Sequence, residues 1–169
     1  MRNYRFALIT PLAIAVSIAT AAPASAAPVM TLKGCNPAAA AKVVVATNAY
    51  RASLGLPHLT VVPKLSAFAV THADDMAITA TLTHSSSSGL SFAQRARDSS
   101  YRFSTMRENI AVESAPLPSS LGPKLWSLWR HSPEHDANMR ARDVTQIGVA
   151  VAPGANGCYA SMELGSPRG

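Results

Sequence analysis

The sequence predicts an α+β domain in which helices pack on a small, mainly antiparallel sheet. Two observations carry this prediction. The expected elements follow the order helix, helix, helix, strand, helix, strand, strand, and the last two strands flank a short turn rich in proline and glycine. The length of 169 residues suits one domain, and 48% hydrophobic with 14% charged residues excludes a disordered chain.

The N-terminal segment has the pattern of a secretory signal peptide. Arg2 and Arg5 precede an uncharged run from Phe6 to Ser25, which closes on a small-residue A-x-A cleavage sequence. We expect cleavage after Ala26, which leaves residues 27–169 as the mature domain, lowers the net charge from +6 to +4 and leaves no transmembrane segment. An uncleaved membrane anchor is the alternative, because about 20 uncharged residues can span a bilayer.

Three helices are expected in the first half of the mature domain. Asn36 is a good N-cap, Pro37 suits the first helical position, and Gly55 suits the end of the first helix. The second helix is expected over Pro63 to Leu82 and the third over Phe92 to Ser99. Helical spacing predicts that the first helix packs through Val43, Ala46, Tyr50 and Leu54.

Most elements expected in the second half of the mature domain are strands. A strand is expected over Glu108 to Glu113, followed by a linker that includes Pro116 and Gly122-Pro123, and then by a helical segment around Trp129. Residues 146–152 and 158–164 are expected to form the closing hairpin, because Pro-Gly-Ala-Asn-Gly between them is a turn signal.

The chain has two cysteines, Cys35 and Cys158. Export places them in an oxidising compartment, so we expect a disulfide that closes nearly the whole mature chain. Two buried free thiols are the alternative. Neither cysteine has neighbours in the sequence that predict a catalytic thiolate.

No nucleophile motif or glycine-rich phosphate loop is present in the sequence. His131 to His135 matches H-x-x-E-H, the inverted zinc-protease motif, which needs both histidines on one helix. Pro133 would break such a helix, and Ser132-Pro133 instead predicts the start of a new one. We therefore reject the protease interpretation.

Three residues at the expected ends of elements are the candidate site: His84, Glu108 and His135. His72 lies on the apolar side of the second helix and is expected to be a core residue. Four arginines, at positions 95, 97, 102 and 107, could contact anionic lipid or an acidic envelope polymer, or form a solvated helical face. No basic run is dense enough to predict nucleic-acid binding.

Five short motifs follow one another along the chain: Asn48-Ala49-Tyr50-Arg51, Leu82-Thr83-His84-Ser85, Glu108-Asn109-Ile110-Ala111, Ser132-Pro133-Glu134-His135 and Ile147-Gly148-Val149. In their order and spacing they resemble the CAP superfamily, also called the SCP domain, in its compact bacterial branch. The resemblance spans about Val43 to Leu164, and the order and spacing of the motifs make it specific.

The resemblance implies an α-β-α sandwich with an extracellular cleft formed by His84, Glu108 and His135. It also implies that the two histidines could hold Zn²⁺ or another divalent metal, which suits imidazole chemistry. Many members have a second Glu three residues after the tryptophan; here Ser132 stands there, with Glu134 nearby.

The expected function is that of a secreted or envelope-located binding module for a lipid or sterol, an envelope component or a protein. The alternative is a metal-dependent hydrolase in the cell envelope, with Glu108 as general base on a metal-bound water. A third interpretation is a structural secreted domain, in which the cleft residues only hold neighbouring loops.

Overall fold

The structure is a computed structural model that describes residues 35–36, 38–114 and 119–169. The predicted signal peptide, Pro37 and Pro116 lie outside the described residues. Within the described part, none of the helices combines the length and the apolar character needed to cross a membrane.

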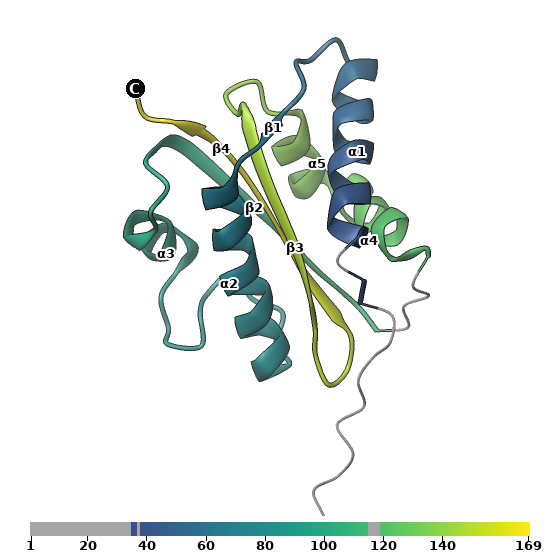
Figure 1. Ribbon diagram of the computed structural model, residues 1–169, viewed down its shortest axis with the longest axis vertical. Coiled ribbons are helices and arrows are strands. Elements are labelled where there is room, and N and C mark those ends of the chain that lie inside the picture. Colours follow the sequence, from purple (N-terminus) through teal and green to yellow (C-terminus); the bar gives the residue numbers. More distant parts are fainter. Residues whose placement is uncertain (1–34, 37, 115–118) are drawn as a thin grey trace, which may run out of the picture.

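A four-stranded sheet lies between two layers of helices (Figure 1). The strands are arranged in the order β1-β3-β4-β2, where β1 is Thr60–Val61, β2 is Phe103–Glu113, β3 is Gln146–Pro153 and β4 is Cys158–Pro167. β4 pairs antiparallel with β2 and β3, and the short β1 pairs parallel with β3. The predicted α+β class and the mainly antiparallel sheet are confirmed.

Helices α2 (Pro63–Thr79) and α3 (Phe92–Asp98) form one layer, and α1 (Ala38–Ser53), α4 (Leu121–Arg130) and α5 (Pro133–Arg140) form the other (Figure 1). Each face of the sheet has its own apolar core. The larger core includes Trp129 and Met162 on the α1 side, and the smaller one includes Met76 and Tyr159 against α2. Alternation along the strands divides their side chains between these two cores.

Several predicted boundaries were wrong. α2 ends at Thr79 instead of Leu82, because Ala80 takes a left-handed conformation and its N–H bonds back to the carbonyl of Met76. β2 begins at Phe103, five residues before the predicted start, because it pairs with β4 along its whole length. Gly122 was assigned to a linker but lies inside α4, where a Cβ would collide with Ala39 of α1.

The packed face of α1 also differs from the prediction. Its buried residues are Ala39, Val43, Thr47 and Arg51, whereas Leu54 is 44% exposed. Arg51 is almost fully buried because its guanidinium donates to three main-chain carbonyls, those of Pro57, Met139 and Ala141. These carbonyls replace water around the charge, so a rule that selects only apolar residues misses this position.

Gly148 is required where β3 passes directly under α2. A Cβ on this residue would collide with the main chain of Leu65 and Ser66. We therefore expect Gly148→Ala to lower the free energy of unfolding by about 2–3 kcal/mol, because main-chain atoms can give way only if α2 moves. Urea unfolding followed by circular dichroism tests this, and a change below about 0.5 kcal/mol would contradict the predicted collision.

Candidate functional site

The site is built around Glu108 on β2, the strand at one edge of the sheet. Alternation along β2 points Glu108 and Ile110 toward the α2 layer, where Ile110 belongs to the smaller core. The intervening Asn109 points the other way and donates to the main-chain carbonyl of His135 on α5. The carboxylate of Glu108 is therefore buried, with only 1% of its side chain exposed.

Two cationic or polar side chains hold the Glu108 carboxylate. Arg95 of α3 donates from Nη2 to both oxygens, at 2.9 and 2.7 Å, and His84 places Nδ1 2.7 Å from Oε1. Arg95 also donates to the main-chain carbonyl of His84 at 2.8 Å, so α3, the loop after α2 and β2 are joined at one point.

Arg95 is itself largely buried, with 9% of its side chain exposed. Its guanidinium lies 5.2 Å from the ring centre of Phe68 and 5.7 Å from that of Phe92. Aromatic faces of this kind favour a cation that has lost part of its hydration. Arg95 is thus a component of the site, although nothing in the sequence pattern distinguishes it from the other three arginines nearby.

A second carboxyl group, that of Glu163 on β4, lies opposite Glu108 in the sheet. Directly opposite residues share a face, so both carboxyl groups point toward α2. Glu163 is fully buried and accepts a 2.7 Å hydrogen bond from Ser161 Oγ. Glu163 was not among the predicted site residues. The signal available in the sequence was the spacing of Ser161 and Glu163, which puts two polar side chains on one face of an expected strand.

The two carboxyl groups differ in charge state. Burial raises the pKa of Glu163 well above its ordinary value, and the nearby charge of Glu108 raises it further. Burial alone would also raise the pKa of Glu108, but hydrogen bonds from His84 and Arg95 and the Arg95 charge hold it below its ordinary value. Glu108 is therefore the carboxylate and Glu163 the neutral acid of the pair.

This assignment gives a pH-dependent prediction for Glu163→Gln, because glutamine resembles the neutral acid. Native Glu163 holds its proton above pH 4.5, where an unfolded glutamate loses it, so the wild-type protein loses stability as pH rises toward the raised pKa. The loss is at most about 1.4 kcal/mol per pH unit. The variant lacks this loss, so we expect its stability relative to wild type to increase by about 1–3 kcal/mol between pH 4.5 and 7.

Urea unfolding of both proteins at several pH values measures this difference. Glu134→Gln is the matched control, because Glu134 is exposed in the first turn of α5. It should show no comparable increase with pH. A constant difference between Glu163→Gln and wild type from about pH 4.5 to 8 would contradict the neutral-acid assignment.

The other histidines occupy distinct positions. His72 is buried, as its place on α2 predicted, but its Nε2 lies 3.7 Å from Oε2 of Glu108, so it borders the site as well. Burial lowers the pKa of His72, against the opposing charge of Glu108. His131 is the C-cap of α4, whereas His135 lies in α5, which begins at Pro133. The predicted start of a new helix between the two histidines is therefore confirmed.

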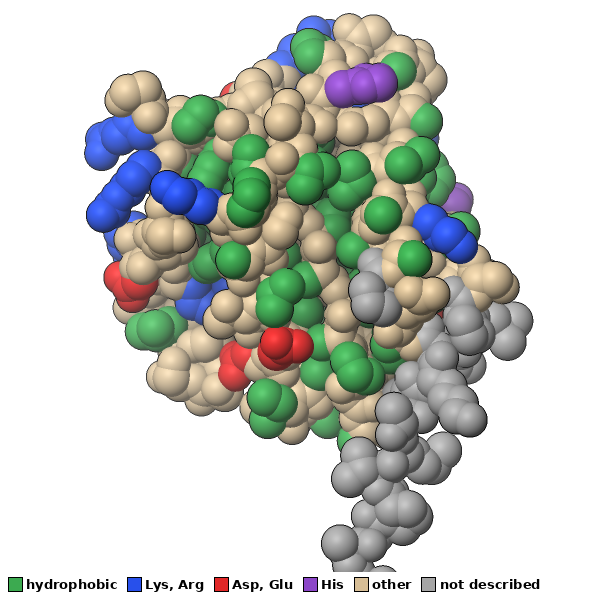
Figure 2. Space-filling view, viewed as in Figure 1, with side chains coloured by type: hydrophobic (Ala, Val, Ile, Leu, Met, Phe, Trp, Pro, Cys, Tyr) green, Lys and Arg blue, Asp and Glu red, His purple; other side chains and the backbone are tan. Residues whose placement is uncertain are grey.

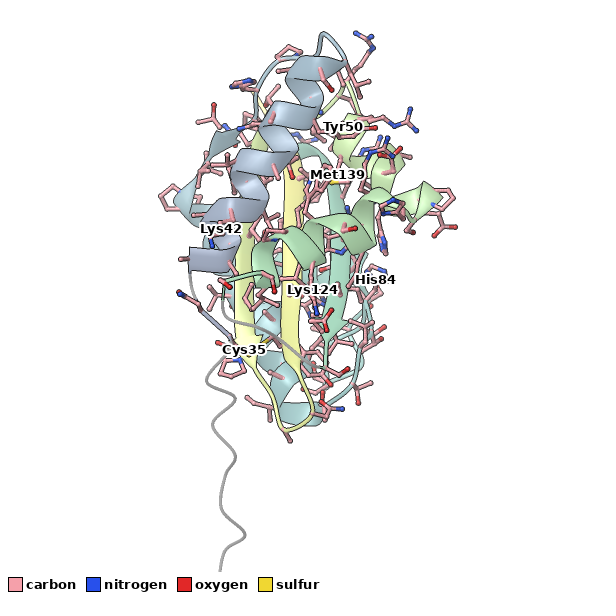
Figure 3. All side chains as sticks on the ribbon, turned by 90° about the vertical axis from the view of Figure 1, so that its right-hand side faces the viewer. Cys35, Lys42, Tyr50, His84, Lys124 and Met139 are labelled. Carbon is pink, nitrogen blue, oxygen red and sulfur yellow. A yellow bond between two sulfur atoms is a disulfide. The ribbon has the colours of Figure 1, made fainter. Side chains whose placement is uncertain are left out.

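Among the predicted site residues, the structure brings His84 and Glu108 into direct contact at the free edge of the sheet. Figure 3 shows His84 beside that edge. His135 is held in the opposite helical layer. It is half-buried, and this burial lowers its pKa, as does the nearby His84 ring to a smaller extent; both favour the neutral imidazole.

The side-chain atoms of the site that could bind a metal ion are few. In the described part of the chain, no group of three or more His, Cys, Asp or Glu is arranged to hold a metal ion. Both oxygens of Glu108 already face Arg95, whose charge opposes a cation bound to them. The side chain of His84 is 53% exposed and its Nδ1 is occupied by Glu108, which leaves Nε2 as its available ligand atom.

A hollow of about 740 Å³ adjoins this cluster, between α2 and the segment from the serine-rich loop to α3. His72 and Arg95 lie on its wall, and apolar side chains line much of its length: Ala67, Phe68, Val70, Ile78 and Leu90. Figure 2 shows hydrophobic side chains across the face of the molecule that carries α2. We call this hollow the α2–α3 groove.

The cysteines are paired as predicted. Cys35, ahead of α1, is bonded to Cys158, the first residue of β4. These are the two cysteines of the chain, so the alternative of buried free thiols is excluded.

Comparison with known families and structures agrees with this fold. The model of the cysteine-rich secretory protein family, CAP, matches residues 44–164. A comparison with curated protein sequences finds no match.

Among solved structures, the chain is similar to an outer surface protein of Borrelia burgdorferi, with a TM-score of 0.68 and 20% identity over 78% of this chain and 94% of that one. It is also similar to an extracellular SCP-domain protein of Bacillus anthracis, with a TM-score of 0.64 and 21% identity, covering 76% of this chain and 40% of that one. NaASP2, solved with Zn²⁺, has a TM-score of 0.59 and 14% identity over 81% of this chain and 84% of that one.

Proposed function

Since this chain belongs to the CAP, or cysteine-rich secretory protein, family, we propose that it is an exported binding module whose α2–α3 groove takes an apolar ligand. The observation that carries the proposal is an open groove of about 740 Å³ whose lining includes the apolar side chains of Ala67, Phe68, Val70, Ile78 and Leu90. Val70 is 47% and Ile78 84% exposed there, which is typical of a surface that binds a partner when such residues gather in one hollow.

The polar cluster beside the groove suits binding better than hydrolysis. A hydrolase of the kind considered above needs Glu108 as a base that can reach a water molecule. Its carboxylate is buried and already bonded to Arg95 and His84. Its partner Glu163 is fully buried, so the pair is not available for general acid–base work on a bound substrate. We propose that this cluster holds α3 and the loop after α2, which contains His84, in place; together they form one wall of the groove.

Equilibrium binding of monododecanoylglycerol to the purified protein, produced by export from its own gene sequence, tests the function. We expect saturable one-to-one binding in calorimetry. Because Val70 and Ile78 are exposed, serine at both positions should weaken binding at least about fivefold without unfolding the protein. Val45→Ser is the matched control, since Val45 is 68% exposed on α1, in the opposite layer. Absence of binding by the folded wild-type protein would overturn the proposal.

We propose separately that His84 and His135 hold a divalent metal such as Zn²⁺ at the free edge of the sheet. Neutral imidazoles suit this metal, and the lowered pKa of His135 favours its neutral form. With two protein ligands, the affinity should be weak. Calorimetric titration with ZnCl₂ tests this: His84→Ala and His135→Ala should each abolish saturable binding, whereas His58→Ala, in an exposed loop, should not. Unchanged binding in either site variant would contradict the proposed site.

A further inference from the structure

A second hollow lies next to the α2–α3 groove at Lys64. It measures about 470 Å³ and shares Lys64 with the groove. Arg102 and Arg168 also line it, together with Tyr101 and Gln146. No acidic residue lines it among the residues that the structure describes. We call it the basic hollow.

The cations of the basic hollow are not neutralised within the protein. Lys64, Arg102 and Arg168 are all exposed, and in the described ranges none of them forms an ion pair. By contrast, Arg95 and Arg107 of the same basic region are paired with Glu108 and Asp143. The main chain fixes two of the three cations near one another, since the N–H of Arg168 donates to the carbonyl of Arg102 at 3.0 Å.

The groove itself has a mixed charge in which acids outnumber cations. Its lining includes Asp74, Asp75 and Asp98 together with the cations Lys64 and Arg95, and Arg95 is already paired with Glu108. An anionic group is therefore disfavoured along the groove and favoured in the basic hollow. Figure 2 shows most of the Lys and Arg side chains of this face gathered on the α3 side, where acidic side chains also lie.

From these observations we infer that the groove and the basic hollow together bind a single-chain amphiphile, with its chain along α2 and a phosphate head group among Lys64, Arg102 and Arg168. This inference rests on the proposed function and names its ligand class. At 1.5 Å per residue, α2 rises roughly 21 Å between Lys64 and Ile78, which leaves room for a long extended chain. A phosphate monoester offers three oxygens and up to two negative charges to three cations, which suits this site better than a carboxylate.

Calorimetry with three probes tests the inference: dodecyl phosphate below its critical micelle concentration, monododecanoylglycerol and inorganic phosphate. We expect dodecyl phosphate to bind at least about tenfold more tightly than monododecanoylglycerol, and inorganic phosphate alone to bind far more weakly than either. The preference should decrease with added salt, because the head-group contacts are exposed.

Arg102→Gln combined with Arg168→Gln should remove the preference for dodecyl phosphate and leave the affinity for monododecanoylglycerol unchanged, because neither residue lines the groove. Arg97→Gln combined with Arg142→Gln is the matched control, because it removes the same charge from exposed arginines that do not line the hollow. An equal loss in the control pair would attribute the preference to net charge and overturn the inference.

The failures of the two proposals are distinguishable. Equal affinity for both amphiphiles would overturn the inference and leave the proposed function in place. Binding of neither amphiphile would overturn both. Inorganic phosphate binding as tightly as dodecyl phosphate would identify a phosphate site without a chain, and binding only to vesicles of anionic phospholipid would identify a membrane surface; either result would overturn the inference.

Discussion

Reduction of the Cys35–Cys158 disulfide is expected to lower the free energy of unfolding by about 4–5 kcal/mol. The two cysteines are 123 residues apart, so the bond restricts most of the unfolded chain. Chain-entropy estimates increase with the length of the closed loop and give a value of this size for a loop of this length. Urea unfolding with and without dithiothreitol, followed by circular dichroism, measures the difference.

A double variant, Cys35→Ala with Cys158→Ala, separates the bond from side effects of the reductant. Its stability should not respond to dithiothreitol. It should lie close to that of the reduced wild type, with a small additional loss because Cys158 is fully buried in the larger core. A shift of less than about 1 kcal/mol on reduction of the wild type would show that the bond contributes little in this fold.

Features set by local signals were predicted well from the sequence. Pro63 and Pro133 each begin a helix, as a proline in the first turn favours. The hairpin of β3 and β4 encloses the predicted turn. The cysteine pairing also followed from the cysteine count, since a chain with two cysteines has one intramolecular pairing available.

Features set by long-range partners were not predicted. The four arginines between positions 95 and 107 form one basic cluster in the sequence, but the fold gives them different environments. Arg95 is largely buried and forms an ion pair with Glu108, Arg107 pairs with Asp143, and Arg102 is exposed. Each outcome depends on which strand or loop lies opposite, and charge patterning within a short segment carries no information about that partner.

Glu163 shows the same limit on the site itself. The second glutamate expected near Trp129 is missing from the sequence, and Glu134, the nearby alternative, is exposed in the structure. The second carboxyl group comes instead from β4, 55 residues beyond Glu108, through the strand register that places the two residues opposite each other. A shift of this register by one residue would have turned Glu163 to the other face.

Arg95→Met is expected to lower the free energy of unfolding by about 3–5 kcal/mol, because it leaves the buried Glu108 carboxylate without its cation. Methionine keeps much of the apolar volume beside Phe68 and Phe92, so most of the loss should come from the charge. The pKa of Glu108 should rise in the variant, since Arg95 is one of the groups that now lower it. Urea unfolding and NMR titration of the Glu108 carboxyl group measure the two effects.

Two further variants separate the lost ion pair from damage to α3. Arg97→Met changes an exposed arginine of the same helix and should cost less than about 0.5 kcal/mol. Adding Glu108→Gln to Arg95→Met removes the uncompensated charge and should restore part of the lost stability, since an amide is far less costly to bury than a carboxylate. If the double variant were less stable than Arg95→Met by the full cost of Glu108→Gln alone, the two residues would not be coupled. The wall of the α2–α3 groove would then owe its position to the Phe68–Phe92 ring contact and not to this ion pair.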